Sequence, residues 1–316
     1  MNVKRSLKML SESPVVTVEA VDLSSYDVIC VSSSAGKDSQ AMLDYVVELA
    51  DKAGVRDRIV VVHADLGRVE WQGTKEFAEE QANHYGVRFE VVSRIGSVSD
   101  GRSKDGNALY AAGEVRGDLL DQVEHRAAQL KAQGKDSPAW MSSASRYCTA
   151  DHKRGPIGTV FTKLADEWKK ANPGAGRACR TLDCQGLRAA ESPRRAKKAN
   201  LENRTSTKSQ HVDSWLPIQD WSTEQVWTRI KASGVPYHRA YDLGMPRLSC
   251  VFCIFASKDA LMIAGKHNPE LLSEYVRVEK ETGYSFKADL SLASIQEALS
   301  AGEAVPVQVS DWDDAA

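Results

Sequence analysis

The sequence contains no apolar run that approaches the length of a membrane-spanning helix. Residues 1–13 include basic side chains but no apolar segment of signal-peptide length, so we expect a cytoplasmic protein that does not enter a membrane. No internal repeat is present, and the formal net charge is only −2 over 316 residues. This overall charge does not by itself indicate a nucleic-acid partner. The apolar content of 42% is sufficient for a sizeable core, in one large domain or two.

Cysteine is infrequent, and none follows position 253. The six cysteines are Cys30, Cys148, Cys179, Cys184, Cys250 and Cys253. In a cytosolic protein, such residues are metal ligands or reactive thiols more often than disulfide partners. Cys30 and Cys179 fall in predicted strands, where we interpret them as buried apolar side chains.

The first hundred residues alternate between two kinds of segment. Short apolar runs predict strands at 28–31, 59–62 and 89–92. Amphipathic segments predict helices at 39–52, 74–85, 118–134 and 157–170. Gly54 and Gly86 stand where the first two helices should end. This alternation predicts an α/β fold, with a parallel sheet and helices on both faces.

The turn between the first strand and the first helix is the most informative segment. Residues 32–39 read Ser-Ser-Ser-Ala-Gly-Lys-Asp-Ser. Small residues allow backbone N–H groups to converge on an anion, and the helix N-terminus adds a partial positive charge. The turn therefore predicts a phosphate site, although an ordinary turn without a ligand is the alternative. It is not a Walker loop, which needs Gly, four residues and then Gly-Lys-Ser/Thr.

Cys250 and Cys253 form a Cys-x-x-Cys pair, which can bind a metal or cluster or form a redox disulfide. Two unmodified thiols are the alternative. Cys148 lies in a basic segment with Lys153, and Cys184 lies near Gly186, so up to four ligands are present. Their spacing fits neither a compact zinc finger nor a ferredoxin run. The fold would have to gather them around an iron–sulfur cluster or zinc.

A third constellation is Gly-Leu-Arg-Ala-Ala-Glu-Ser at 186–192. The planar guanidinium of Arg188 suits two phosphate oxygens, whereas the alternative is a surface helix start with an Arg188–Glu191 pair. The surrounding stretch 177–208 is strongly basic. It is compatible with DNA binding, a solvated face or a funnel for nucleotides. We interpret His238 as a partly buried histidine with satisfied hydrogen bonds rather than a catalytic one.

Four blocks occur in one order: the turn at 32–39, the block at 186–192, Trp-x-Pro-Ile-x-x-Trp at 215–221, and Tyr-Asp-x-Gly at 241–244 before the cysteine pair. Together they resemble the phosphoadenosine-phosphosulfate reductase superfamily of adenine nucleotide α-hydrolases, over residues 26–260. The first block is similar to the PP-loop of ATP pyrophosphatases, with Ala35 in place of that pattern's first glycine. The resemblance implies a Rossmann-like sheet with a helical C-terminal extension that carries the cysteine pair.

We accordingly divide the chain into an N-terminal extension (1–25), a PP-loop nucleotide-binding α/β domain (26–235), a cysteine-pair and helical region (236–300) and an acidic tail (301–316). The polar, glycine-rich segment 96–113 is interpreted as a loop that orders when substrate binds.

The resemblance also implies a set of site residues. ATP would bind at the turn, with adenine near Asp65 and Mg²⁺ bridging the phosphates through Asp38. The implied catalytic residues are Lys37, Asp38 and Arg188. The implied nucleotide contacts are Ser32, Ser34, Gly36, Lys37, Asp38, Ser39, Asp65, Gly186 and Arg188. The implied ligands of a [4Fe–4S] cluster are Cys148, Cys250 and Cys253, with Cys184 or an open site as the fourth. Zinc is the alternative metal.

Two branches of the superfamily fit in different degrees. Sulfonucleotide reductases use a thiolate near the C-terminus, and no cysteine follows Cys253. The Dnd- and Ssp-type enzymes of DNA phosphorothioation keep the ATP pyrophosphatase chemistry and an iron–sulfur cluster, and the sequence resembles them more. We expect an enzyme that adenylates a DNA backbone phosphate for replacement by sulfur. Its partners would be a cysteine desulfurase and other subunits of a modification complex. The alternatives are a reductase that borrows a thiol and a non-catalytic iron–sulfur nucleotide sensor.

Overall fold

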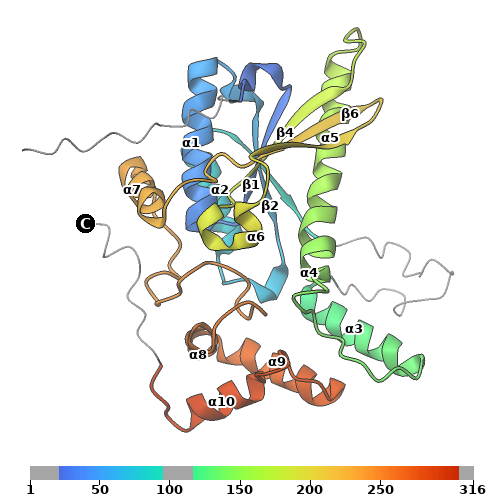
Figure 1. Ribbon diagram of the computed structural model, residues 1–316, viewed down its shortest axis with the longest axis vertical. Helices are drawn as coiled ribbons and strands as arrows, with labels where there is room; N and C mark the ends of the chain where they lie inside the picture. The colour runs from blue at the N-terminus through green and yellow to red at the C-terminus, as the bar shows by residue number, and fades with distance from the viewer. Residues whose placement is uncertain (1–20, 95–116, 306–316) are drawn as a thin grey trace, which may run out of the picture.

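The computed structural model describes residues 21–94 and 117–305 (Figure 1). The predicted loop 96–113 lies outside the described residues, as do residues 1–20 of the N-terminal extension and 306–316 of the acidic tail. Within the described ranges, no helix combines the length and the apolar character needed to cross a membrane.

A six-stranded sheet forms the centre of the upper part of the molecule, in the order β3-β2-β1-β4-β6-β5. All neighbouring strands are parallel except the β5–β6 hairpin, which is antiparallel. The strands are β1 (Val28–Ser33), β2 (Ile59–Ala64), β3 (Arg88–Val92), β4 (Cys179–Gln185), β5 (Leu201–Ser206) and β6 (Gln210–Trp215). The α/β class and the three predicted strands are confirmed. The β5–β6 hairpin was not predicted, because β5 is exposed along its whole length and so lacks an apolar face.

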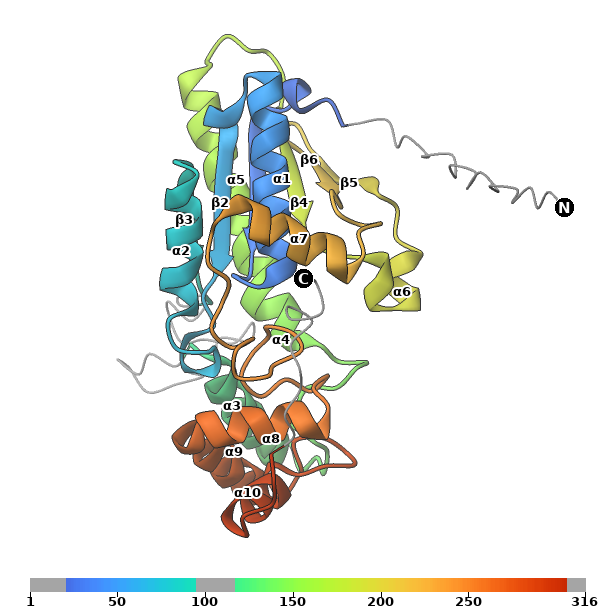
Figure 2. The same cartoon turned by 90° about the vertical axis from the view of Figure 1, so that its left-hand side faces the viewer.

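Helices cover both faces of this sheet, as the alternation predicted (Figures 1 and 2). Ile29 and Val31 of β1 pack with α1, whereas Val28 and Cys30 of the same strand pack with α5. This alternation follows from the two-residue side-chain period of a strand. The helices are α1 (Lys37–Ala53), α2 (Thr74–His84), α3 (Leu119–Ala132), α4 (Tyr147–Thr149), α5 (Gly155–Ala171), α6 (Pro193–Ala196), α7 (Thr223–Ser233), α8 (Lys258–His267), α9 (Pro269–Thr282) and α10 (Leu292–Ser300).

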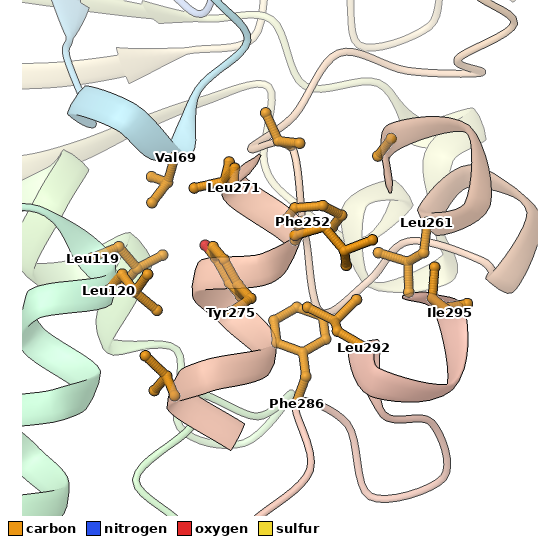
Figure 3. Close-up of a cluster of buried hydrophobic side chains, with 14 of the residues drawn as sticks. Val69, Leu119, Leu120, Phe252, Leu261, Leu271, Tyr275, Phe286, Leu292 and Ile295 are labelled. Atoms are coloured by element: carbon orange, nitrogen blue, oxygen red, sulfur yellow. The ribbon is translucent and has the colours of Figure 1, made fainter. Parts of the chain in front are cut away.

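A second hydrophobic core lies among the helices at the lower end of the molecule (Figures 1 and 2). It combines residues of α3 with residues of α8, α9 and α10, which confirms the predicted helical C-terminal extension. Phe252, between the two cysteines of the pair, is buried in this core (Figure 3). Its ring centroid lies 5.1 Å from that of Tyr275 in α9. The cysteine pair is therefore anchored in the helical core through Phe252.

Candidate functional site

The carboxyl ends of the parallel neighbours β1 and β4 lie side by side, at the point where the order in which strands are added to the sheet reverses. From β1 the chain proceeds to β2 and β3 on one side, and it returns with β4 on the other side of β1. In open α/β sheets, ligands bind outside the strand ends at such a position. The turn after β1 and the turn after β4 both lie there, and they touch. A Cβ atom on Gly186 would lie 3.1 Å from backbone atoms of Asp38 and Ser39, so glycine allows this close approach of the two turns.

The turn after β1 contains a left-handed residue that is not glycine. Ala35 has φ 58°, and it is the one non-glycine residue with positive φ in the described ranges. Its methyl group is fully buried. This position is where the similar pattern has glycine, so the substitution places a cost of about 1 kcal/mol in the loop. The loop shape is held by its own serines: the Ser39 hydroxyl donates to the Gly36 carbonyl at 2.9 Å, and the Ser34 N–H donates to Ser39 Oγ at 3.2 Å.

A carboxylate between two cations stands at the start of α1. Lys37 Nζ lies 3.1 Å from one Asp38 oxygen, and Arg188 Nε lies 2.6 Å from the other. Lys37 and Arg188 are both buried, with 5% and 3% of their surface exposed. Arg188 also donates to the Trp221 carbonyl at 3.1 Å and to Thr223 Oγ1 at 3.3 Å. The structure thus places Arg188 as the residue that orients Asp38, and the three side chains together carry one net positive charge beside the turn.

Two other predicted nucleotide contacts are engaged with the protein. Ser32 lies within β1, and its hydroxyl donates to Asp183 of β4 at 3.1 Å. Burial raises the pKa of Asp183, which Gln185 and Arg204 contact as well. Asp65 follows β2, and its carboxylate accepts the Gly67 N–H at 2.8 Å. Asp65 therefore shapes the loop that leaves β2 at the same edge of the sheet.

His63 is a site residue that sequence reasoning missed. It is the next-to-last residue of the fully buried strand β2, with 1% of its surface exposed. Its Nδ1 lies 3.1 Å from the carbonyl oxygen of Ser33, the last residue of β1, and its Nε2 lies 3.3 Å from Glu70. The only available signal was a histidine two residues before Asp65.

Three of the four predicted ligands come together. Cys148 in α4 and the pair Cys250 and Cys253 are all partly exposed. Burial raises the pKa of Cys148, and Cys253 raises it further. Burial also raises the pKa of Cys250, with Cys253 and Cys148 adding to the rise and Lys153 opposing it. These mutual effects place the three thiols in one region of the structure.

Lys153 provides a positive charge beside these thiols. It lies in a π-helical turn (Ala150–Arg154) between α4 and α5, an irregularity that is frequent at functional sites. Burial lowers the pKa of Lys153, but Cys250, Glu70 and Cys253 outweigh burial, so that the net shift is upward. A donor set of three thiolates suits iron–sulfur clusters and zinc. Among the described residues, however, no three Cys, His, Asp or Glu side chains are already arranged as a metal site.

The fourth predicted ligand, Cys184, is not brought to this group. It lies in β4, is fully buried and packs in the core between the sheet and α1. A strand residue on that face cannot reach the loops beyond the strand ends. Cys30 and Cys179 are buried in strands as predicted. His238 is also buried and hydrogen-bonded as predicted: its Nδ1 accepts the Ala240 N–H, and its Nε2 lies 3.2 Å from Thr74 Oγ1.

The segment that contains the cysteine pair (residues 248–253, the cysteine segment) packs against the turn at 32–39. A Cβ atom on Gly36 would lie 3.2 Å from Leu248 Cβ, and the Val251 N–H donates to the Val69 carbonyl at 2.9 Å. At the exposed edge of the cysteine group, which we call the rim, the Arg146 guanidinium lies 5.7 Å from the ring centroid of Phe255. The Phe255 side chain is 50% exposed. These two residues stand two positions from Cys148 and Cys253. Two motifs more than 200 residues apart in sequence therefore lie side by side in the structure.

Comparisons with known proteins give three kinds of match to this chain. The phosphoadenosine phosphosulfate reductase domain matches residues 28–256. An adenosine 5'-phosphosulfate reductase of Staphylococcus epidermidis is 26% identical over 147 residues, 45% of this chain and 57% of the reductase, so the match spans little more than half of that protein. An uncharacterized 37.8 kDa protein of Escherichia phage 186 is 26% identical over 264 residues, 79% of this chain and 74% of the phage protein. A crystal structure of phosphoadenylyl-sulfate reductase from Candida auris has a TM-score of 0.40 at 14% identity, over 72% of this chain and 83% of that one.

Proposed function

This chain belongs to the phosphoadenosine phosphosulfate reductase domain family, and from that membership we propose that it is an ATP pyrophosphatase that activates an acceptor oxygen for replacement by sulfur. The observation that carries the proposal is the contact between the nucleotide turn and the cysteine segment. Leu248, two residues before Cys250, packs on Gly36. A nucleotide held at the turn would therefore have its phosphates beside the thiols.

The residues at the turn suit the first step. The partial positive charge at the N-terminus of α1 favours the triphosphate, and Lys37 neutralises its charge. Asp38 holds Lys37 and Arg188 in place, and it is the proposed contact for Mg²⁺. An acceptor oxygen attacks the α-phosphorus, the bond to the bridging oxygen breaks, and pyrophosphate leaves. This catalysis consists mainly of positioning and charge neutralisation.

The second step replaces the activated oxygen. A sulfur nucleophile attacks the adenylated acceptor, and AMP leaves with the oxygen. Cys148, Cys250 and Cys253 are the residues that would hold a [4Fe–4S] cluster, or zinc as the alternative, and a bound cluster would supply a relay point for sulfur. Because Cys184 is buried elsewhere, the fourth cluster position is open in this proposal. A cysteine desulfurase is the proposed source of sulfur.

DNA is the proposed acceptor, within a modification complex of several subunits. The Arg146–Phe255 pair at the rim offers an aromatic face for a base and a guanidinium for a phosphate. Arg194, Lys197 and Lys198 follow the turn after β4, are exposed, and have no carboxylate partner among the described residues. Both features favour a nucleic-acid backbone over a small sulfonucleotide, because backbone binding is electrostatic.

A sulfonucleotide reductase is the second candidate. The relative from Staphylococcus epidermidis is an adenosine 5'-phosphosulfate reductase. Residues 254–316 supply no cysteine, so a reductase reaction would need a thiol from another source.

The test is pyrophosphate release from ATP by anaerobically purified protein, with and without DNA. Lys37→Ala should lower the rate by at least about 100-fold, because it removes the lysine cation of the turn. Lys52→Ala is the matched control, since Lys52 is an exposed lysine at the other end of α1 and should leave the rate unchanged. A Lys37→Ala variant with the rate of the unmodified protein would remove the proposed site.

A further inference from the structure

One buried hydroxyl touches both halves of the site. Tyr241, between α7 and α8, has 3% of its surface exposed. Its oxygen accepts the Lys37 N–H at 2.9 Å and the Leu248 N–H at 3.4 Å. Its ring packs edge-on against Trp227 of α7, with 5.1 Å between centroids. The first contact belongs to the nucleotide turn and the second to the segment that leads to Cys250.

The hydroxyl serves as the cap of α1. Gly36 occupies the N-cap position and has no side chain with which to accept a hydrogen bond. The first N–H groups of a helix need an acceptor from elsewhere, and Tyr241 supplies it from a position 204 residues away. The oxygen also lies 3.3 Å from the position that a Cβ of Gly36 would occupy, so the turn and the phenol are in direct contact.

The cysteine segment has different attachments on its other sides. Val251 is bonded to the loop after β2, and Phe252 is buried in the helical core (Figure 3). Among the described residues, Tyr241 is the only one whose side chain hydrogen-bonds to both the turn and this segment. This hydroxyl and the Leu248–Gly36 contact therefore connect the turn directly to the segment.

We propose that Tyr241 is a positioning residue that couples nucleotide binding at the turn to the order of residues 248–253. The inference rests on the proposed function only in assigning the nucleotide to the turn. A phosphate bound at the N-terminus of α1 orders the turn, the Lys37 N–H of that turn donates to the phenol oxygen, and the same oxygen accepts the Leu248 N–H. Coupling of this kind is reciprocal, so the order of the cysteine segment also raises nucleotide affinity.

Hydrogen exchange of the full-length protein tests the proposal. The probe is α,β-methylene-ATP, which the proposed reaction cannot cleave, and the signal is amide exchange in residues 248–253. The analogue should slow this exchange at least about fivefold in the unmodified protein, a factor typical of coupled sites. Tyr241→Phe keeps the ring and removes the acceptor. It should still bind the analogue, roughly tenfold more weakly, but with no change in exchange at 248–253.

Tyr237→Phe is the matched control. Tyr237 also packs on Trp227, at 5.6 Å, but its hydroxyl donates to Asp242 and does not reach the turn. This variant should keep the full nucleotide effect. Slowed exchange in Tyr241→Phe equal to that of the unmodified protein would overturn the proposal. If Tyr241→Phe does not fold, the unmodified protein still decides, because unchanged exchange at 248–253 in saturating analogue also overturns it. Coupled exchange without pyrophosphate release from ATP would support Tyr241 and reject the proposed reaction.

Discussion

The strands of the sheet hold three cysteines, and the segments beyond its carboxyl edge hold the other three. Cys30, Cys179 and Cys184 are buried to 1% exposure or less and lie in the cores on the two faces of the sheet. Cys148, Cys250 and Cys253 are partly exposed, and each of them raises the pKa of Lys153.

The difference shows that position decides what a thiol does. In a strand, cysteine is a small apolar side chain, and burial raises the pKa of Cys30 and Cys184 far above the ordinary value. Such thiols stay protonated and inert. Beyond the strand ends, the same residue lies beside the Lys153 cation, and there we propose that it holds a metal or relays sulfur.

The largest expected effect is the loss of bound iron on substitution of a cysteine beyond the strand ends. After anaerobic reconstitution with ferrous iron and sulfide, we expect brown protein that absorbs near ~400 nm. Cys253→Ala should lose this absorbance and nearly all bound iron, because a loop ligand is removed. Cys30→Ala should keep both. Iron retained by Cys253→Ala but lost by Cys30→Ala would reverse the assignment of the two regions.

Burial also shifts the pKa of a histidine, His238, and this shift makes the stability of the fold depend on pH. Burial lowers the pKa of His238 from 6.5 to about 4. The neutral ring therefore stabilises the fold above pH 6.5, and this contribution is lost as the pH falls toward 4. The loss amounts to at most about 3 kcal/mol. Urea unfolding at pH 7.5 and pH 5 measures it.

His238→Gln is the variant for this experiment. His152, whose pKa is also lowered by burial to about 4, gives the same sign, so only the difference between the two proteins isolates His238. The variant should lose less stability between the two pH values than the unmodified protein. Equal losses would mean that His238 is not held neutral by burial.

Exposed apolar side chains should divide between the two regions in the same way. Phe255, at the rim of the cysteine group, should stack on a base, so Phe255→Ala should weaken binding of fluorescent single-stranded DNA roughly tenfold. Leu201→Ala is the control, because Leu201 is similarly exposed, at 44%, but lies on β5. Fluorescence anisotropy measures both. Equal weakening by the two substitutions would remove the rim from the DNA-binding surface.

The smallest effect concerns stability without metal. Cys184→Ala leaves a small cavity in a packed core and should lower the free energy of unfolding by about 1 kcal/mol. Cys253 is partly exposed, so Cys253→Ala should change the free energy of unfolding by less than about 0.5 kcal/mol. Denaturant unfolding of metal-free protein checks both values, and the reverse order would contradict the division into packing and ligand cysteines.

Local patterns predicted much of this fold. The helix α1 ends at Gly54, which is left-handed with φ 66°, as its position after an amphipathic run indicated. Gly186 was assigned to the site from the resemblance, and a Cβ atom there would lie 3.1 Å from the backbone of Asp38, which is a tight contact. Gly54 follows from the local pattern, whereas the contact of Gly186 joins segments that are far apart in sequence.

Long-range contacts could not be predicted in the same way. Cys184 was grouped with the ligands by residue type, because spacing does not reveal which face of a strand a side chain occupies. The acceptor for the Lys37 N–H is Tyr241, and nothing within the turn indicates a partner so far along the chain. Glu70 beside His63 is a similar case.

The most direct test of the account identifies the products of one anaerobic preparation. It is supplied either with ATP, with and without DNA, or with phosphoadenosine phosphosulfate and thioredoxin, and pyrophosphate, AMP and sulfite are quantified. The account predicts pyrophosphate and AMP from ATP, faster with DNA, and no sulfite. Sulfite formed at a rate comparable to ATP cleavage would contradict it in favour of a reductase, and bound nucleotide with neither activity would contradict it in favour of a sensor.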